Sequence, residues 1–268
     1  MNGQHLNLDR APRNGQRPAY SLRALGRNDL PPRVIVGGRT YLHRSTVKHD
    51  FYAATGFYAA ADNSNDLVVV KLGRTEDFVG VPLKWLGRWL CRRETRIYET
   101  LADVPNIPKL LGRVGETGFI HSFVRGRPLD RKTRVPDGFF PKLQDLLGEL
   151  HRRGIAYVDT DKLPNILLGD DGRPHLIDFQ ISWDQHTLGG GRLSQIWLRR
   201  MQREDVYHIL KHKRRMRPDE LTPQELRGSR PSLLIRIHRL VIAPYKSVRR
   251  HTFARLREAG RLLPEGSE

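Results

Sequence analysis

The chain has 268 residues, enough to bury a substantial core as one large domain or two smaller lobes. Its 47 lysines and arginines outnumber its 29 acidic residues, and this excess, +18 in formal charge, favours polyanions such as nucleic acid, acidic lipid headgroups or phosphorylated glycans as neighbours. A single cysteine excludes an internal disulfide, and we see neither a secretory signal nor an apolar run of about 18 residues. We therefore expect a cytoplasmic protein that does not span a membrane.

The N-terminal part of the sequence predicts a flexible arm followed by a small antiparallel sheet. Residues 1–33 are rich in Arg, Asn, Gly and Pro, a composition typical of a flexible basic arm. From residue 34 to residue 73, β-branched and aromatic runs are separated by Gly-Gly and by the turn former DNSND, which predicts three antiparallel strands. The next stretch, PLKWLGRWLCRRETRIYETLA, places apolar residues at helical spacing and predicts a long helix.

The remainder predicts two more strands and then a mainly helical region. The strands flank a Gly-Glu-Thr-Gly turn, and the Arg-Gly-Arg-Pro connector at 125–128 is the candidate hinge. FFPKLQDLLGELHRRGI predicts a helix with a leucine face that ends at Gly154. Residues 157–182 predict strand, turn and strand, and basic helices come after them. We expect an N-lobe at 34–124 and a C-lobe at 125–268.

Four residues in this order carry groups suited to ATP-dependent phosphoryl transfer. That reaction needs a cation on the phosphates and oxygen ligands for Mg²⁺. Lys71 ends the run VVVK, so a strand would present its ammonium group, and Glu94 on the following helix could pair with it. Asn165 and Asp178 are hard oxygen ligands at the two edges of one predicted hairpin. They could therefore share one metal site.

These segments, together with FIHSFVRGRPL, ELHRRGIAYVDTDKLPNILL and LIDFQIS, resemble the protein-kinase-like superfamily. The likeness is nearest to the small bacterial lipopolysaccharide kinases and RIO-type kinases. The resemblance implies an α+β, bilobal protein-kinase-like fold, with a small antiparallel β lobe carrying one long helix and a larger, mainly α-helical lobe. It also implies that Lys71 binds the α and β phosphates of ATP, that Glu94 anchors Lys71, and that Asn165 and Asp178 bind Mg²⁺.

Two motifs depart from the kinase pattern. The family's DFG reads DFQ here, so Gln180 replaces a flexible glycine, which should restrict flipping of the segment while keeping the metal ligand. The loop H-R-D-x-x-x-x-N has four residues between base and asparagine, whereas five lie between Asp159 and Asn165. Either Asp159 is the base in a bulged loop, or Asp161 is, or catalysis is lost. We favour Asp159, because it ends the apolar run IAYV.

The loop expected to cover the phosphates has fewer glycines than the kinase pattern G-x-G-x-x-G. The equivalent stretch, KHDFYAATGFY, contains only Gly56. Backbone amides of an ordinary hairpin can still contact phosphate, and Lys48 or His49 could add positive charge. We therefore predict cofactor contacts by Lys48 and Gly56 and a modest nucleotide affinity.

The class of acceptor is indicated by the part of the chain after Asp178. The segment ISWDQHTLGGGRL is short and lacks the APE anchor of protein kinases, which favours a small or surface-bound substrate. Basic clusters at 199–217 and 236–257 would attract an anionic one. The stretch SLLIRIHRLVIAPYKSVRR suits an interfacial helix on an anionic membrane, or equally a helix that packs on the large lobe.

The first hypothesis is a kinase of a sugar or lipid-linked glycan hydroxyl that uses ATP and Mg²⁺ in the cytoplasm, at the inner face of an anionic membrane. The alternatives are a Ser/Thr protein kinase and a catalytically silent pseudokinase scaffold. Nucleic-acid binding ranks below these, because no aromatic residues are interleaved with the basic ones to stack bases. The sequence leaves the oligomeric state open.

Overall fold

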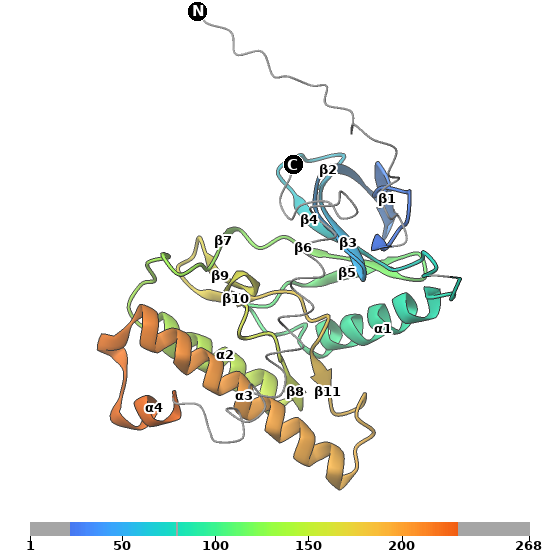
Figure 1. The fold of residues 1–268 in the computed structure, drawn as a ribbon. Helices are drawn as coiled ribbons and strands as arrows, with labels where there is room; N and C mark the ends of the chain where they lie inside the picture. The colour runs from blue at the N-terminus through green and yellow to red at the C-terminus, as the bar shows by residue number, and fades with distance from the viewer. Residues whose placement is uncertain (1–21, 79, 230–268) are drawn as a thin grey trace, which may run out of the picture.

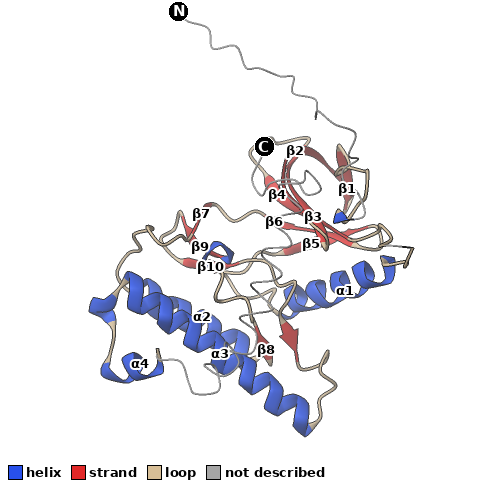
Figure 2. Cartoon of the chain, in the orientation of Figure 1, coloured by secondary structure: helices blue, strands red, loops and turns tan. Residues whose placement is uncertain are grey.

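Figure 1 shows the protein, a computed structural model, which describes residues 22–78 and 80–229. Most of the expected N-terminal arm and the basic segment 236–257 lie outside the described residues. A six-stranded antiparallel sheet with one helix beside it forms one part of the molecule, and a mainly helical region forms the rest, as the colouring in Figure 2 shows. The described residues therefore combine a six-stranded sheet and two smaller sheets, β10-β9-β7 and β11-β8, with several helices.

The sheet has the strand order β1-β2-β3-β4-β6-β5. Its strands are β1 (Arg33–Val36), β2 (Arg39–His49), β3 (Ala53–Ala60), β4 (Leu67–Gly73), β5 (Leu110–Val114) and β6 (Gly118–Ser122). The expectation of three strands before the first helix was wrong, because the Gly-Gly pair divides the first of them. Gly37 and Gly38 both have positive φ, 58° and 76°, and Val36 pairs with Arg39 across this two-residue turn.

The expected boundary of the arm at residue 33 was also too late. Leu25 and Leu30 are buried against Ala54 of β3, and the backbone N–H of Ala24 donates to the carbonyl of Asp50 over 2.7 Å. Residues 22–32 therefore cover part of the sheet. Burial of two leucines explains this packing, since each contributes about 1.5–3 kcal/mol.

Helix α1 (Lys84–Thr100) crosses beside the sheet and contacts β4 and β6. It is the long helix that the sequence predicted. Gly87 permits the close approach, because a Cβ there would lie 2.1 Å from the carbonyl oxygen of Arg74. The buried face of α1 includes Glu94, Ile97 and Tyr98, so a carboxylate enters the interior with the apolar side chains.

The remaining elements come after the connector that leaves β6. They are β7 (Gly126–Pro128), α2 (Phe139–Arg152), β8 (Ile155–Ala156), the 3-10 helix η2 (Leu163–Asn165), β9 (Ile166–Gly169), β10 (Pro174–Leu176), β11 (Trp183–Asp184), α3 (Arg192–Met216), the 3-10 helix η3 (Pro218–Glu220) and α4 (Pro223–Gly228). The connector expected as a free hinge forms strand β7, which pairs with β9. As predicted, α2 ends before Gly154, whose φ is 70°.

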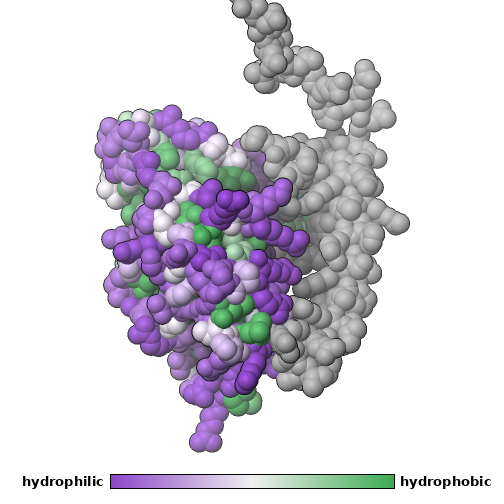
Figure 3. Space-filling view, turned by 90° about the vertical axis from the view of Figure 1, so that its left-hand side faces the viewer, coloured by the Kyte–Doolittle hydropathy of each residue, from purple (hydrophilic) through white to green (hydrophobic). Residues whose placement is uncertain are grey.

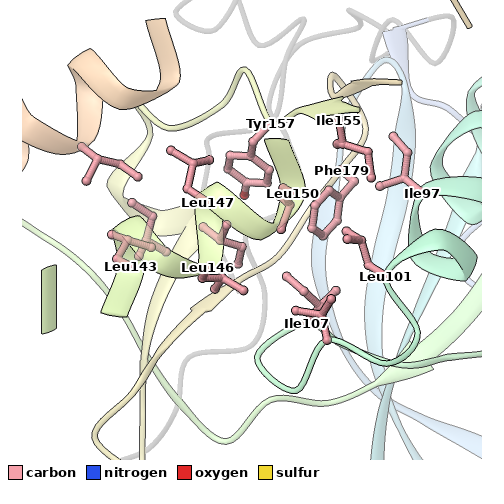
Figure 4. Packing of buried hydrophobic residues seen from close by; sticks show 14 of the residues in the cluster. Ile97, Leu101, Ile107, Leu143, Leu146, Leu147, Leu150, Ile155, Tyr157 and Phe179 are labelled. Atoms are coloured by element: carbon pink, nitrogen blue, oxygen red, sulfur yellow. The ribbon is translucent and has the colours of Figure 1, made fainter. Parts of the chain in front are cut away.

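One hydrophobic cluster joins the helical region to α1. Leucines of α2 pack with Tyr157 and Phe179, with Ile97 of α1 and with Leu101 directly after it (Figure 4). Because these residues come from segments on both sides of the connector, their packing fixes the position of the loops that lie between them. Within the described ranges, no helix combines the length and the apolar character that a membrane span requires.

Candidate active site

A lysine and two carboxylates meet where β4, α1 and the segment after β10 converge. The ammonium group of Lys71 donates to Glu94 Oε1 over 2.8 Å and to Asp178 Oδ1 over 2.7 Å. Lys71 and Glu94 are buried, and the Asp178 side chain is 33% exposed. The sequence places Asp178 107 residues after Lys71, so only the fold brings this trio together.

The trio contains a charged pair, Lys71 and Asp178, at neutral pH. Burial raises the pKa of Asp178, but the adjacent Lys71 outweighs it and holds that pKa at about 2. Burial lowers the pKa of Lys71, but Asp178 and Glu94 outweigh it and keep that pKa above its ordinary value. Burial raises the pKa of Glu94 above its ordinary value, and the adjacent Lys71 limits that rise. Lys71 is therefore protonated and Asp178 ionised, as a phosphate-binding cation and a metal ligand must be.

The conformation of the DFQ segment points Asp178 at Lys71. Asp178 has a φ of 62°, and Phe179 is fully buried with its ring edge-on to Tyr98 and Tyr157, at centroid distances of 5.1 and 5.2 Å. A non-glycine residue with positive φ is uncommon and is held there by its surroundings. The buried phenyl ring supplies that constraint, so Phe179 acts as the anchor of the segment.

Helix α1 is tied to this segment by two arginines. Arg93 donates to the backbone oxygen of Gln180, and its guanidinium lies 4.5 Å from the Trp89 ring and 4.7 Å from the Trp183 ring. Arg96 donates to Asp184 over 2.7 Å. Stacking of a guanidinium on two indoles stabilises the contact. These bonds hold α1, and with it Glu94, against the residues that come after Asp178.

Asp159 lies beside this cluster. Its Oδ2 accepts from Asn165 Nδ2 over 2.6 Å and from Lys162 Nζ over 2.9 Å. Burial raises the pKa of Asp159 above its usual value, Lys162 opposes that shift, and the charge of Asp178 adds to it. The backbone N–H of Ile177, the residue before Asp178, donates to the carbonyl of Asn165 over 3.1 Å, so Asp159, Asn165 and Asp178 lie on adjoining segments.

Asp161 is turned away from that group. It is exposed and pairs with two residues of α3, His208 at 3.0 Å and Lys211. His208 and Lys211 hold the pKa of Asp161 well below its usual range. The neighbouring Thr160 hydroxyl is buried and donates to Asp205 over 3.1 Å. The extra residue is thus accommodated by directing Thr160 and Asp161 toward α3, which leaves Asp159 in the site.

Asp205 positions the loop that carries Asp159, a role that sequence reasoning missed. This α3 residue is 1% exposed, and its carboxylate accepts the backbone N–H groups of Tyr157 and Val158, each over 2.8 Å. His151 of α2 lies 3.3 Å away. Val158, with a φ of 68°, is the second non-glycine residue with positive φ in the described chain. The sequence contained one signal for this role, namely that Asp205 is an acidic residue on the apolar face of a basic helix.

Lys48 and Gly56 lie in the hairpin of β2 and β3. Lys48 pairs with Asp50 at 2.7 Å, and its charge also lowers the pKa of Asp178, so it contributes positive field at the site. Gly56 lies within β3 rather than in the turn, and a Cβ there would lie 2.6 Å from Leu30 Cδ1. Leu30 fills the space beside Gly56 on the side where a Cβ would point. A phosphate group therefore cannot contact Gly56 from that side.

The turn itself offers fewer backbone donors than we expected. Asp50 Oδ1 accepts the N–H of Tyr52 over 2.8 Å and that of Ala53 over 3.0 Å. These are amides that a phosphate-covering turn would otherwise direct at its ligand. A carboxylate of the chain therefore occupies the place where a phosphate oxygen could bind.

Comparison with known proteins identifies the fold. No family model matches the chain, and no curated protein matches its sequence. The Rio2 kinase-ADP/Mg²⁺-phosphoaspartate complex from Chaetomium thermophilum is similar in structure, with a TM-score of 0.50 and 16% identity, over 71% of this chain and 59% of that one. A second Rio2 kinase structure from the same organism has a TM-score of 0.48 and 16% identity, over 71% and 61%. The first of these likenesses shows a protein-kinase-like fold. The chain spans about three fifths of the length of these kinases.

Proposed function

We propose that this protein is an ATP-dependent phosphotransferase that acts on a hydroxyl group and uses Mg²⁺. The observation that carries the proposal is the cluster in which Lys71 bonds both Glu94 and Asp178 beside Asp159 and Asn165. A cation, metal-binding oxygens and a carboxylate for the attacking hydroxyl are the three groups that phosphoryl transfer needs. The fold shared with Rio2 kinase, whose complex contains ADP and Mg²⁺, supports the same use here.

The residues present fit Mg²⁺ bound together with nucleotide phosphates. Asn165 uses its amide nitrogen to donate to Asp159, which leaves its amide oxygen for a metal, and Asp178 is ionised. Among the described residues, no group of three or more His, Cys, Asp or Glu could hold a metal alone. That fits a Mg²⁺ site with one or two protein ligands and substrate phosphates. When bound, Mg²⁺ would neutralise charge on the phosphates.

Each residue then has a distinct task. Lys71 would give one of its N–H groups to the phosphates, and Glu94 would keep the ammonium in place. Asp159 would orient the acceptor hydroxyl and accept its proton, for which its raised pKa is suited. Lys162, which bonds the same carboxylate oxygen, would limit how far that pKa rises.

The acceptor that we propose is a hydroxyl of a sugar or lipid-linked glycan, reached from the cytoplasmic face of an anionic membrane. The short stretch between Asp178 and α3 and the excess of basic residues support this class. A Ser or Thr of a protein is the second candidate, and the Rio2 likeness in fold fits it equally well. A silent pseudokinase scaffold is the third, since the loop carries an extra residue.

The deciding experiment is transfer of the γ-phosphate of ATP to membrane glycolipid, protein and RNA fractions, with Asp178→Ala as the control. We expect labelling of glycolipid that the control lacks. Binding of Mg·ATP, measured by calorimetry on wild type and Lys71→Ala, runs in parallel. Labelling of protein alone would move the acceptor to the second candidate. Tight Mg·ATP binding without any transfer would favour the pseudokinase, and equal binding by both proteins would overturn the site.

A further inference from the structure

A small pocket lies beside the catalytic loop, apart from the Lys71 cluster. Its volume is about 160 Å³, and its walls are Arg131, Leu163, His212, Arg215 and Met216. These residues come from the segment between β7 and α2, from η2 and from the C-terminal turns of α3. The pocket therefore joins three elements around one cavity.

The pocket is coupled to the loop that carries Asp159. Leu163 directly follows Lys162, whose ammonium bonds Asp159 over 2.9 Å. His212 donates from Nε2 to the carbonyl of Thr160 over 3.0 Å. The pocket therefore adjoins the loop that holds Asp159. A substrate whose hydroxyl lies at Asp159 would have its reacting end near this pocket.

Two arginines give the pocket its charge. Burial lowers the pKa of His212 to about 4, so its ring is neutral at pH 7 and the positive charge belongs to Arg131 and Arg215. Both are exposed, and neither forms an ion pair or a side-chain hydrogen bond with any residue in 22–78 or 80–229. Their guanidinium groups are therefore available to a ligand.

Other basic residues at this end of α3 do have partners in the protein. Lys211 pairs with Asp161, Lys213 with Glu225 at 2.7 Å, and Arg217 with Asp137 at 2.8 Å. Asp130, next to Arg131 in the chain, accepts from the backbone of Lys132 and from the Thr133 hydroxyl. The acidic side chains near the pocket thus already bond to other groups. Among the described residues, none of them pairs with Arg131 or Arg215, the arginines that give the pocket its positive charge.

We propose that this pocket binds a phosphate group carried by the acceptor substrate, so that the protein phosphorylates a molecule that is already phosphorylated. The inference rests on the proposed function. A phosphate monoester carries nearly two negative charges and accepts paired hydrogen bonds from guanidinium groups. The cavity is large enough for one such group, and the described residues on the face drawn in Figure 3 are mostly hydrophilic. The phosphates of ATP have their own cation in Lys71, on the sheet.

Methionine NMR tests the pocket without requiring any transfer. The chain has three methionines, so ¹³C-methyl labelling gives three signals. Met216 lines the pocket, whereas Met201 lies fifteen residues earlier on α3, about 22 Å away along the helix axis. Inorganic phosphate is titrated at constant ionic strength. We expect a saturable shift of the Met216 signal with Met201 unchanged, and about tenfold weaker binding in Arg131→Gln/Arg215→Gln.

The controls separate this subsite from the nucleotide site. Arg199→Gln/Arg203→Gln removes the same charge from exposed positions on α3 and should keep the wild-type response. Lys71→Ala should also keep it, so a failure of the proposed function would not erase the signal. A shift that does not saturate, or that is equal in the pocket variant, would overturn the proposal. Stronger binding of acetate than of phosphate would overturn it too, in favour of a carboxylate.

Discussion

The loop that carries Asp159 and the β2–β3 turn are held in place in different ways. The loop is fixed by buried bonds, because Asp205 holds the backbone of Tyr157 and Val158 from below. The turn is held through its carbonyl groups: that of Asp50 accepts from the backbone N–H of Ala24 over 2.7 Å, that of Phe51 from the Arg74 guanidinium over 3.0 Å, and that of Tyr52 from the backbone N–H of Arg74 over 2.9 Å. β2 pairs with β3 through two register shifts, and the turn is closed by its own Asp50. The carbonyls of the turn therefore have partners outside it, whereas the N–H groups of Tyr52 and Ala53 bond to its own Asp50.

The difference indicates how the two regions contribute to function. A loop with buried anchors keeps Asp159 in place even with an extra residue, since the surplus is directed to α3. A turn whose amides are occupied by Asp50 contributes little to phosphate binding, so nucleotide affinity should depend on Lys71, Lys48 and the metal ligands. Catalysis should therefore be sensitive to the loop, and ATP binding insensitive to the turn.

The largest expected effect compares the two acidic residues of the loop. Asp159→Asn keeps the size of the side chain but loses the carboxylate, so turnover should fall by about 10²-fold or more with Mg·ATP binding intact. Asp161→Asn is the matched control. It removes only an exposed pair with His208 and Lys211, and we expect turnover within about threefold of wild type. Initial-rate kinetics and calorimetry measure both. A larger loss in Asp161→Asn would transfer the role of base to that residue.

The second effect tests the buried anchor. Asp205→Asn replaces a carboxylate that accepts two backbone N–H groups, and leaves one of these donors without an acceptor. The free energy of unfolding should fall by about 3 kcal/mol, and turnover should fall with it. The neighbouring Glu204→Gln, which loses only a 3.4 Å surface pair with Arg200, should cost under about 1 kcal/mol. Urea denaturation measures both variants. Equal losses would show that Asp205 does not anchor the loop.

A third test changes pH dependence rather than maximal rate. If Asp159 accepts the proton of the acceptor hydroxyl, as proposed, it must be ionised, so activity should be lost as pH falls through its pKa. Lys162 lowers that pKa, and Lys162→Met should raise it. The acid limb of the kcat/KM profile should therefore move to higher pH. The exposed Lys142→Met is the control and should leave the limb in place. A limb that does not move would mean that Asp159 does not set it.

The smallest effect is expected in the turn region. In Gly56→Ala the new methyl group would meet Leu30 Cδ1, so the leucine must shift and the free energy of unfolding should fall by about 1 kcal/mol. ATP affinity should change less than about twofold, because Leu30 and not phosphate lies over this position. Thermal denaturation and calorimetry give the two values. A tenfold loss of affinity at unchanged stability would place phosphate over Gly56 after all.

Local signals in the sequence predicted the strands, the helices and the order of the candidate residues. Lys71 at the end of a β-branched run, Glu94 on an amphipathic helix and Gly154 at a helix end each depend on neighbours a few positions away. The division of the first strand at Gly37-Gly38 and the packing of Leu25 and Leu30 were missed. Both depend on contacts with distant strands, which periodicity does not report.

The choice between Asp159 and Asp161 required the folded structure. The two residues are two positions apart and chemically identical, so no local rule separates them. Contacts more than forty residues away direct Asp161 to His208 and Lys211, while Asn165 and Lys162 hold Asp159 near Asp178. The order of residues along the chain specifies which reactive groups are present and on which elements they lie. Packing specifies which of them share a site, because it alone brings together residues that are distant in the chain.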